Sequence, residues 1–342
     1  LLFGAGLIGG RLQQGSMNTT AFSFGPLGAK GFAFLNMLQL IGWTSIMIYD
    51  AMLALQALAP LSPMIWTIAI GALVILWLFI GLHNTGYIQA IVSVLLLGLT
   101  LYMGAHMISQ WPNEGSLLTS GNMSFIAALE LSIAMPLSWL PLISDYTRES
   151  KKPFSASLTS ATVYTITSIV MYTLGLSAAI FGGGDSIITI MMNAGLGLAG
   201  LLVIIFSTVT TTFMDAYSAG VSSTTIYNGA SSKGVAVIVT IVGAIAAILY
   251  PMDDITDFLY LIGSVFAPMI AILLADYFVN RQQVQTLSAY LIRGLIWAVS
   301  VGLYHYMLHS ESSIGATLPA FTIAFIVTSI VGFISKTANT LL

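Results

Sequence analysis

Residues 130–148 combine several chemically versatile side chains within an otherwise apolar segment. They include the carboxylate Glu130, the hydroxyl Ser138, the indole Trp139 and two prolines, Pro136 and Pro141. A proline inside a helix removes a backbone hydrogen bond and clashes with the preceding turn. Within a bilayer, a freed carbonyl must face protein or a water-filled cavity. The stretch therefore predicts a broken helix beside a polar binding site, as in secondary transporters. The alternative is a plain proline kink.

A second polar group lies within residues 196–224. Ser207, Thr210, Thr211, Met214 and Asp215 are spaced to share one face of a helix. A stripe of hydroxyls that ends in a carboxylate should not face lipid. Hydroxyl and backbone oxygens suit an alkali cation, so this face predicts a cation site. The alternative is that each threonine hydroxyl bonds to a carbonyl of its own helix.

A third group lies within residues 32–58, where Trp43, Met47 and Asp50 share one helical face. The indole of Trp43 offers a flat stacking surface and one hydrogen-bond donor. Tryptophan is common at membrane interfaces, but Trp43 is in the middle of its segment, which favours a binding role. Asp50 is interpreted either as a partner for a substrate or proton, or as an ion-pair partner of Arg293.

Three carboxylates are expected deep in the membrane, namely Asp50, Glu130 and Asp215. Each could carry a proton or bind the polar edge of a heterocycle. An intramembrane enzyme is a further alternative, but no paired-acid or HExxH motif accompanies these residues. No P-loop is present either, which argues against ATP-driven transport. The chain is predicted not to be an enzyme and to need no cofactor beyond a coupling ion.

The composition indicates a helical protein that resides in a lipid bilayer. Of 342 residues, 57% are hydrophobic and 6% are charged, whereas a typical soluble domain has about 25% charged residues. The net charge is −3 and no basic tract is present, so nucleic acid is not expected as a partner. Residues 11–31 are predicted to form a polar loop. Apolar segments of near the ~20 residues that a bilayer requires fall at about 32–58, 64–82, 87–108, 124–145, 156–181, 196–224, 234–250, 258–280, 284–307 and 314–335.

The charges of the loops between these segments predict the orientation. One set of loops carries eight of the nine basic residues, and the opposite set carries acidic residues with no Lys or Arg. Basic loops face the cytoplasm in membrane proteins. We therefore expect a multi-pass protein of the cell membrane with a cytoplasmic C-terminus. The basic loop residues are Arg11, Lys30, Arg148, Lys151, Lys152, Lys233, Arg281 and Lys336.

Three motifs resemble the nucleobase:cation symporter-1 family. Residues 258–282 are similar to its tenth helix, with a G-x-x-F-x-P core and a D-Y-F-x-x-R exit. Residues 144–153, SDYTRESKKP, resemble the exit of its sixth helix, and residues 22–31, FSFGPLGAKG, the loop before its third. The stretches AMPLSWLPLISDYTR and TTTFMDAYSAG are similar to the branch of hydroxymethylpyrimidine permeases, which import a thiamine precursor.

The resemblance implies an all-α, LeuT-like fold in a single transmembrane domain, residues 1–342. That fold has two inverted repeats of five helices and two additional helices. The first helix and most of the second are then expected to be absent from this chain. Residues 1–10 would be the end of helix two, 32–280 helices three to ten, and 284–335 helices eleven and twelve.

The resemblance also implies roles for individual residues. The family's sodium site uses a carbonyl and two hydroxyls of helix eight, which fall on Ser207, Thr210 and Thr211; its other half comes from helix one. The family's stacking aromatic on helix three falls on Trp43. Two positions depart from the family pattern, because Met47 replaces a polar side chain and Pro136 replaces the aromatic of helix six. Trp139 is then the expected second ring, and Ser138 falls on a small polar position.

The function implied is a secondary active importer of a small pyrimidine, with hydroxymethylpyrimidine as the leading candidate. Coupling to sodium is expected, with protons as the alternative. Cytosine, another nucleobase or a related heterocycle is the alternative substrate. A channel is disfavoured, because kinked helices with an aromatic surface suit stoichiometric binding.

Overall fold

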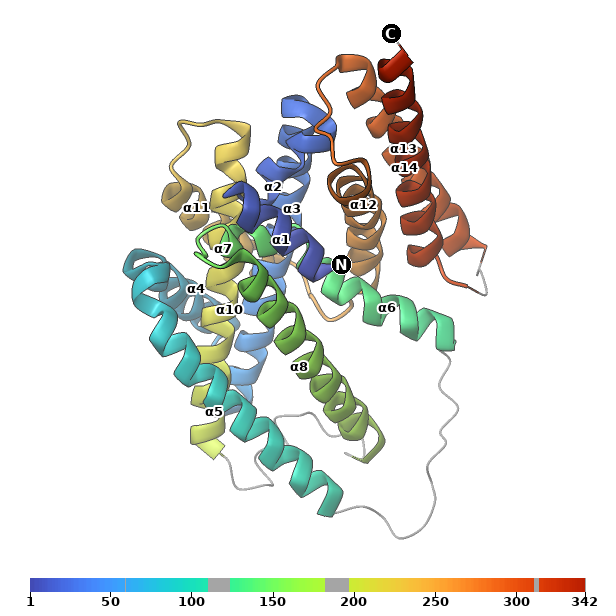
Figure 1. The fold of residues 1–342 in the computed structure, drawn as a ribbon. Coiled ribbons are helices and arrows are strands. Elements are labelled where there is room, and N and C mark those ends of the chain that lie inside the picture. Colours follow the sequence, from blue (N-terminus) through green and yellow to red (C-terminus); the bar gives the residue numbers. More distant parts are fainter. Residues whose placement is uncertain (59, 110–123, 182–196, 311–313, 342) are drawn as a thin grey trace.

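The computed structural model describes residues 1–58, 60–109, 124–181, 197–310 and 314–341, and these residues form helices and no strands (Figure 1). The helices are α1 (Leu2–Leu12), α2 (Ser16–Thr19), α3 (Ala21–Leu58), α4 (Pro63–Ile80), α5 (Leu82–Ser109), α6 (Phe125–Leu137), α7 (Ile143–Thr147), α8 (Pro153–Phe181), α10 (Gly197–Ile226), α11 (Ser232–Leu249), α12 (Thr256–Leu274), the π-helical turn η1 (Ala275–Asn280), α13 (Leu287–His309) and α14 (Thr317–Leu341).

Eight of the described helices are long and apolar enough to cross a membrane, so the chain is a multi-pass membrane protein. They are α3, α4, α5, α8, α11, α12 with η1, α13 and α14, and each overlaps a segment predicted from the sequence. The predicted segment 196–224 is found as α10, which has 30 residues. The predicted segment 124–145 is found as two shorter helices, α6 and α7.

The prediction of a polar loop at residues 11–31 is wrong. This part of the chain forms the end of α1, the short α2 and the beginning of α3. A kink at Gly25 (φ 67°, ψ 178°) divides the helical part of this segment that belongs to α3. Glycine adopts a positive φ without the steric cost of a Cβ atom, and Pro26 then supplies a backbone angle suited to a first helical turn.

The helix α3 lies at the centre of the fold and packs along α10, α11 and α4 (Figure 1). Its residues join two hydrophobic clusters. One cluster connects α3 with α6 and α12, for example through Trp43, Leu137 and Phe266. The other connects α3 with α4 and α10, for example through Ile48 and Phe213. The helices α4 and α5 lie to one side of this centre, and α13 and α14 lie to the other.

A buried ion pair connects η1, which continues α12, to the last two helices. Arg293 of α13 donates from Nη2 to Asp276 Oδ1 at 3.1 Å and from Nε to Oδ2 at 3.3 Å. Asn280 donates to Asp276 Oδ1 (2.8 Å) and to the carbonyl of Thr328 in α14 (3.1 Å). The suggested pairing of Arg293 with Asp50 is therefore wrong.

The sequence also predicts that Asp50 is buried deep in the membrane, but it does not lie among the packed helices. Asp50 is exposed near the end of α3. The neighbouring Tyr49 hydroxyl donates to Asp253 at 3.1 Å, in the segment that precedes α12. Asp50 thus lies beside a second exposed carboxylate, outside the packed interior of the fold.

Candidate functional site

The predicted span 124–145 is broken between α6 and α7. Helix α6 ends at Leu137, residues 138–142 form turns, and α7 begins at Ile143. The amide of Leu142 bonds to Trp139 O at 3.1 Å, and the amide of Asp145 bonds to Leu142 O at 2.9 Å. In a regular helix these two amides would bond to Ser138 O and Pro141 O. The break therefore leaves the carbonyls of Ser138 and Pro141 without helical partners.

Two buried amides of α3 bind these freed carbonyls. Gln39 Nε2 donates to Ser138 O at 3.1 Å, and Asn36 Nδ2 donates to Pro141 O at 3.4 Å. Asn36 also donates to Ser222 Oγ of α10 (2.9 Å) and accepts from Gln39 Nε2 (3.0 Å). Irregular backbone at membrane depth needs such partners, because water cannot reach it. The position of the break is thus fixed by polar residues of α3 that the sequence analysis did not select.

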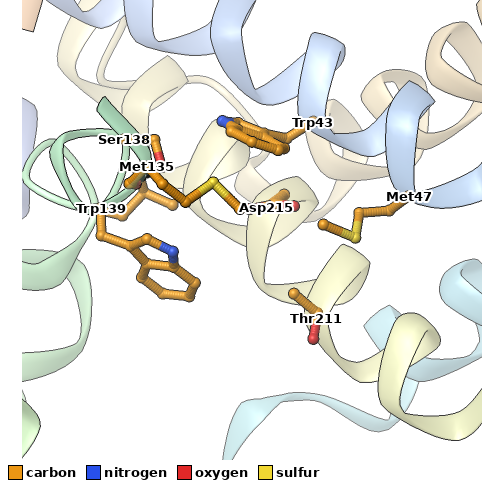
Figure 2. Close-up of a pocket in the computed structure, with 8 residues that line it drawn as sticks. Trp43, Met47, Met135, Ser138, Trp139, Thr211 and Asp215 are labelled. Carbon is orange, nitrogen blue, oxygen red and sulfur yellow. Dashed lines mark hydrogen bonds between the residues drawn. The ribbon is translucent and has the colours of Figure 1, made fainter. Parts of the chain in front are cut away.

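A cavity of about 40 Å³ lies between α3, the broken segment and α10 (Figure 2). Its lining residues are Trp43, Met47, Met135, Ser138, Trp139, Leu142, Thr211 and Asp215. A volume of this size holds a few water molecules. A ring-shaped ligand needs more room, and the two flexible methionine side chains could provide it by changing rotamer.

The structure brings six of the predicted site residues together in this cavity. Trp43 and Met47 come from α3, Ser138 and Trp139 from the broken segment, and Thr211 and Asp215 from α10 (Figure 2). The sequence analysis missed Met135 and Leu142. Met135 precedes Pro136 and Leu142 follows Pro141. An apolar side chain, however, carries no signal that distinguishes a residue lining a pocket from a residue of the core.

Asp215 supplies the cavity with a buried carboxyl group. The residue is 6% exposed, and in the described part of the chain its side chain has no hydrogen-bond or ion-pair partner. A buried carboxylate without a partner is costly. Asp215 therefore needs a proton, a cation or a ligand donor, and the cavity is where such a group can reach it.

The threonine hydroxyls of the predicted ion-binding face, on α10, bond within their own helix. Thr210 Oγ1 and Thr211 Oγ1 both donate to Ser207 O, at 2.9 and 3.0 Å, as the alternative reading of the sequence proposed. Thr211 lines the cavity, whereas Ser207 and Thr210 are not among its lining residues. A hydroxyl that donates one hydrogen bond still has oxygen lone pairs for a cation.

Glu130 lies away from the cavity, so its predicted place among the substrate-binding residues is not supported by its position. Its Oε1 accepts from the amides of Ala316 (3.0 Å) and Thr317 (3.2 Å), and its Oε2 accepts from the amide (3.0 Å) and hydroxyl (2.5 Å) of Thr317. These groups are at the N-terminus of α14, where free amides favour a negative charge. Glu130 therefore caps α14 from α6.

Pro136 lines a separate and larger cavity, of about 400 Å³, together with residues of α1 and α8. Pro136 therefore lines a different cavity from its neighbour Met135, which faces the first cavity. The ring of Trp139 lies 6.1 Å from that of Tyr164 in α8. Of the two positions considered for a second ring, Trp139 is the one in the Asp215 cavity.

A broken helix beside a cavity that contains a carboxyl group, within a bundle of apolar helices, is the arrangement of a secondary transporter. A sequence profile of permeases for cytosine and purines, uracil, thiamine and allantoin matches residues 3–341. The chain belongs to this family, the nucleobase:cation symporters. It is therefore a transporter and not an enzyme, which confirms the prediction and excludes the intramembrane-enzyme alternative.

Solved structures confirm the predicted LeuT-like fold. The transporter Mhp1 of the nucleobase-cation-symport-1 family, closed with bromovinylhydantoin bound, has a TM-score of 0.80 at 16% identity, over 98% of this chain and 82% of Mhp1. Inward-facing Mhp1 has a TM-score of 0.74 at 16% identity, over 98% and 81%. A sodium-coupled sialic acid symporter, outward-open with substrate, has a TM-score of 0.67 at 17% identity, over 95% and 77%. No curated protein matches the chain.

Proposed function

We propose that this transporter imports a small aminopyrimidine, with hydroxymethylpyrimidine as its preferred substrate, and that a cation drives the import. The observation that carries the proposal is that the unpaired carboxyl group of Asp215 and the indole of Trp43 line one cavity (Figure 2). The similarity of residues 134–148 and 210–220 to hydroxymethylpyrimidine permeases supports this choice of substrate.

Two indoles provide the aromatic contacts that a flat heterocycle requires. Trp43 reaches the cavity from α3 and Trp139 from the broken segment, on opposite sides of it (Figure 2). We propose that the pyrimidine ring inserts between them when Met47 and Met135 move. Contacts between aromatic rings add about 0.5–1.5 kcal/mol beyond the burial of their area.

The carboxyl group of Asp215 matches the polar edge of an aminopyrimidine. An exocyclic amine donates a hydrogen bond beside a ring nitrogen that accepts one. A protonated carboxyl group has a donor and an acceptor and satisfies both. Glu130, the other carboxylate considered for this contact, is bound to the N-terminus of α14. Asp215 is therefore the residue we assign to it.

We assign the coupling ion to the α10 face that includes Ser207, Thr210 and Thr211. Sodium is the proposed ion, because carbonyl and hydroxyl oxygens are hard ligands. An ion that binds more tightly to the substrate-binding conformation raises substrate affinity by linkage. A proton carried by Asp215 is the second candidate, because this carboxyl group is buried and has no partner in the described residues.

Ligand binding to the purified full chain tests these assignments. Titrations would compare hydroxymethylpyrimidine, cytosine and uracil in sodium chloride and in choline chloride, followed by heat or by tryptophan fluorescence. We expect uracil, which lacks the amine, to bind weakly, and sodium to strengthen hydroxymethylpyrimidine binding. Failure of every pyrimidine to bind would refute the substrate assignment. Equal affinity in both salts would refute the sodium assignment.

A matched pair of variants tests the role of Asp215. The substitution Asp215→Leu keeps the approximate size of the side chain but removes both its donor and its acceptor, and Asp254→Leu makes the same change at an exposed carboxylate elsewhere. Two neutral hydrogen bonds contribute about 1–3 kcal/mol, so we expect Asp215→Leu to lose about tenfold or more in affinity. Asp254→Leu should bind as the parent does. Unchanged affinity in Asp215→Leu would transfer the amine contact to another residue.

A further inference from the structure

Two buried polar atoms of α3 that lie next to the cavity have no hydrogen-bond partner among the described residues. Gln39 is 4% exposed and Trp43 is 5% exposed. Within the described residues, neither Gln39 Oε1 nor Trp43 Nε1 has a hydrogen-bond partner, although both atoms are buried. A buried polar atom without a partner costs about 1–3 kcal/mol. Such a cost is expected where a ligand later supplies the missing partner.

The orientation of the Gln39 amide follows from its neighbours. Its Nε2 lies 3.0 Å from Asn36 Oδ1 and 3.1 Å from Ser138 O, which are both acceptors. The Asn36 amide is fixed in turn, because its Nδ2 reaches Pro141 O and Ser222 Oγ. Turning the Gln39 amide over would place its oxygen against two acceptors. The hydrogen-bond chain from α10 to the broken segment therefore leaves one group open, the acceptor Gln39 Oε1.

Gln39 and Trp43 both lie beside the Ser138 end of the cavity. They are four residues apart on α3, so their side chains share one helical face. Gln39 donates to the carbonyl of Ser138, and Ser138 is one of the residues that line the cavity. The indole nitrogen of Trp43 is on the side of its ring that faces Ser138 and away from Met47 (Figure 2). A buried acceptor and a buried donor thus belong to neighbouring residues beside Ser138.

We propose that Gln39 and Trp43 form a subsite for the hydroxyl substituent of the substrate. The proposal rests on the proposed function and extends it to specificity. A hydroxyl group both donates and accepts hydrogen bonds at one atom, so it can donate to Gln39 Oε1 and accept from Trp43 Nε1. An amine would satisfy the glutamine alone, and a ring nitrogen would satisfy the indole alone. With Asp215 bound to the amine edge, the hydroxyl is the group of a hydroxymethylpyrimidine that can both donate and accept at one atom.

A comparison of two ligands with three proteins tests the subsite. The ligands are hydroxymethylpyrimidine and its methyl analogue, in which hydrogen replaces the hydroxyl group. The proteins are the parent chain, Gln39→Met and the control Gln56→Met, which alters a glutamine near the other end of α3. We expect the parent and the control to prefer the hydroxyl ligand by about tenfold, as one to two neutral hydrogen bonds would give. In Gln39→Met the preference should disappear.

The ratio of the two affinities separates contact from positioning. If Gln39 only held Ser138 O in place, Gln39→Met would weaken both ligands equally and preserve their ratio, which would overturn the subsite. A full preference retained with unchanged affinities would overturn it as well. The proposed function would stand in both cases. A parent chain that binds neither ligand would instead refute the proposed function.

A second variant serves if Gln39→Met does not fold. Trp43→Phe removes the indole donor and keeps an aromatic ring at the same position. We expect it to reduce the preference for the hydroxyl ligand to below threefold, beyond any common loss from altered stacking. A tenfold preference in Trp43→Phe would remove the indole from the subsite and overturn the proposed pair.

Discussion

Glu130 of α6 accepts a hydrogen bond from the backbone amide of Ala316 at 3.0 Å, although the two residues are 186 positions apart in the sequence. With the amide and hydroxyl of Thr317 on the same carboxylate, one side chain satisfies the first free groups of α14. The contact joins the segment before the helix break to the last helix of the chain. It therefore gives a deep carboxylate a structural role, although sequence reasoning assigned it to the substrate.

We predict that Glu130→Gln lowers stability and leaves substrate affinity intact. The amide offers one acceptor oxygen in place of two and loses the favourable charge at a helix N-terminus, a cost of about 1–3 kcal/mol. Thermal unfolding of purified protein in detergent measures the loss. Glu149→Gln is the control, because Glu149 is exposed and pairs with Arg148 at the surface, where such pairs contribute about 0–1 kcal/mol. A tenfold loss of affinity in folded Glu130→Gln would restore this residue to the binding site.

The ion pair of Asp276 and Arg293 gives a second prediction. Their side chains are 0% and 6% exposed, so Arg293→Met leaves a buried carboxylate without its cation. Breaking a buried pair in this way costs about 3–5 kcal/mol. The double variant Asp276→Asn with Arg293→Met should recover part of the loss, since no uncompensated charge remains. Unfolding curves of the single and double variants provide the measurement. A double variant less stable than Arg293→Met would contradict this account.

Much of the architecture follows from the sequence because hydrophobic length and loop charge are local properties. The break after Leu137 was predicted for the same reason, since Pro136 and Pro141 act on their own helix. What could not be predicted is pairing between helices. The partners of Glu130 lie 186 and 187 positions away, and the partner of Arg293 is in a different helical element, so a single chain gives no sign of them. The same limit concealed Asn36 and Gln39, whose roles depend on carbonyls of another helix.

The threonines of α10 allow a test of ion coupling within one helix. We predict that Thr211→Val reduces the effect of sodium on substrate affinity, because Thr211 is the residue of the proposed ion-binding face that also lines the cavity. Thr212→Val is the matched control, since its hydroxyl is buried and donates to Thr208 O at 2.8 Å. Substrate titrations at increasing sodium concentration measure the shift in apparent affinity. An equal loss of sodium dependence in both variants would indicate a general effect on α10.

The last prediction concerns the kink in α3. It compares a glycine at the kink, Gly25, with a control glycine of the same helix, Gly31. Gly25 has a φ of 67°, and a Cβ atom there would lie 2.7 Å from Tyr290. We predict that Gly25→Ala destabilises the protein, by about 1–2 kcal/mol for the left-handed backbone and further for the contact with the ring. Gly31 is exposed and has no heavy atom within 4 Å of such a Cβ. Gly31→Ala should be neutral or stabilising by up to about 1 kcal/mol, because alanine loses less backbone entropy on folding. Thermal unfolding compares the two variants directly, and equal midpoints would show that the kink does not require glycine.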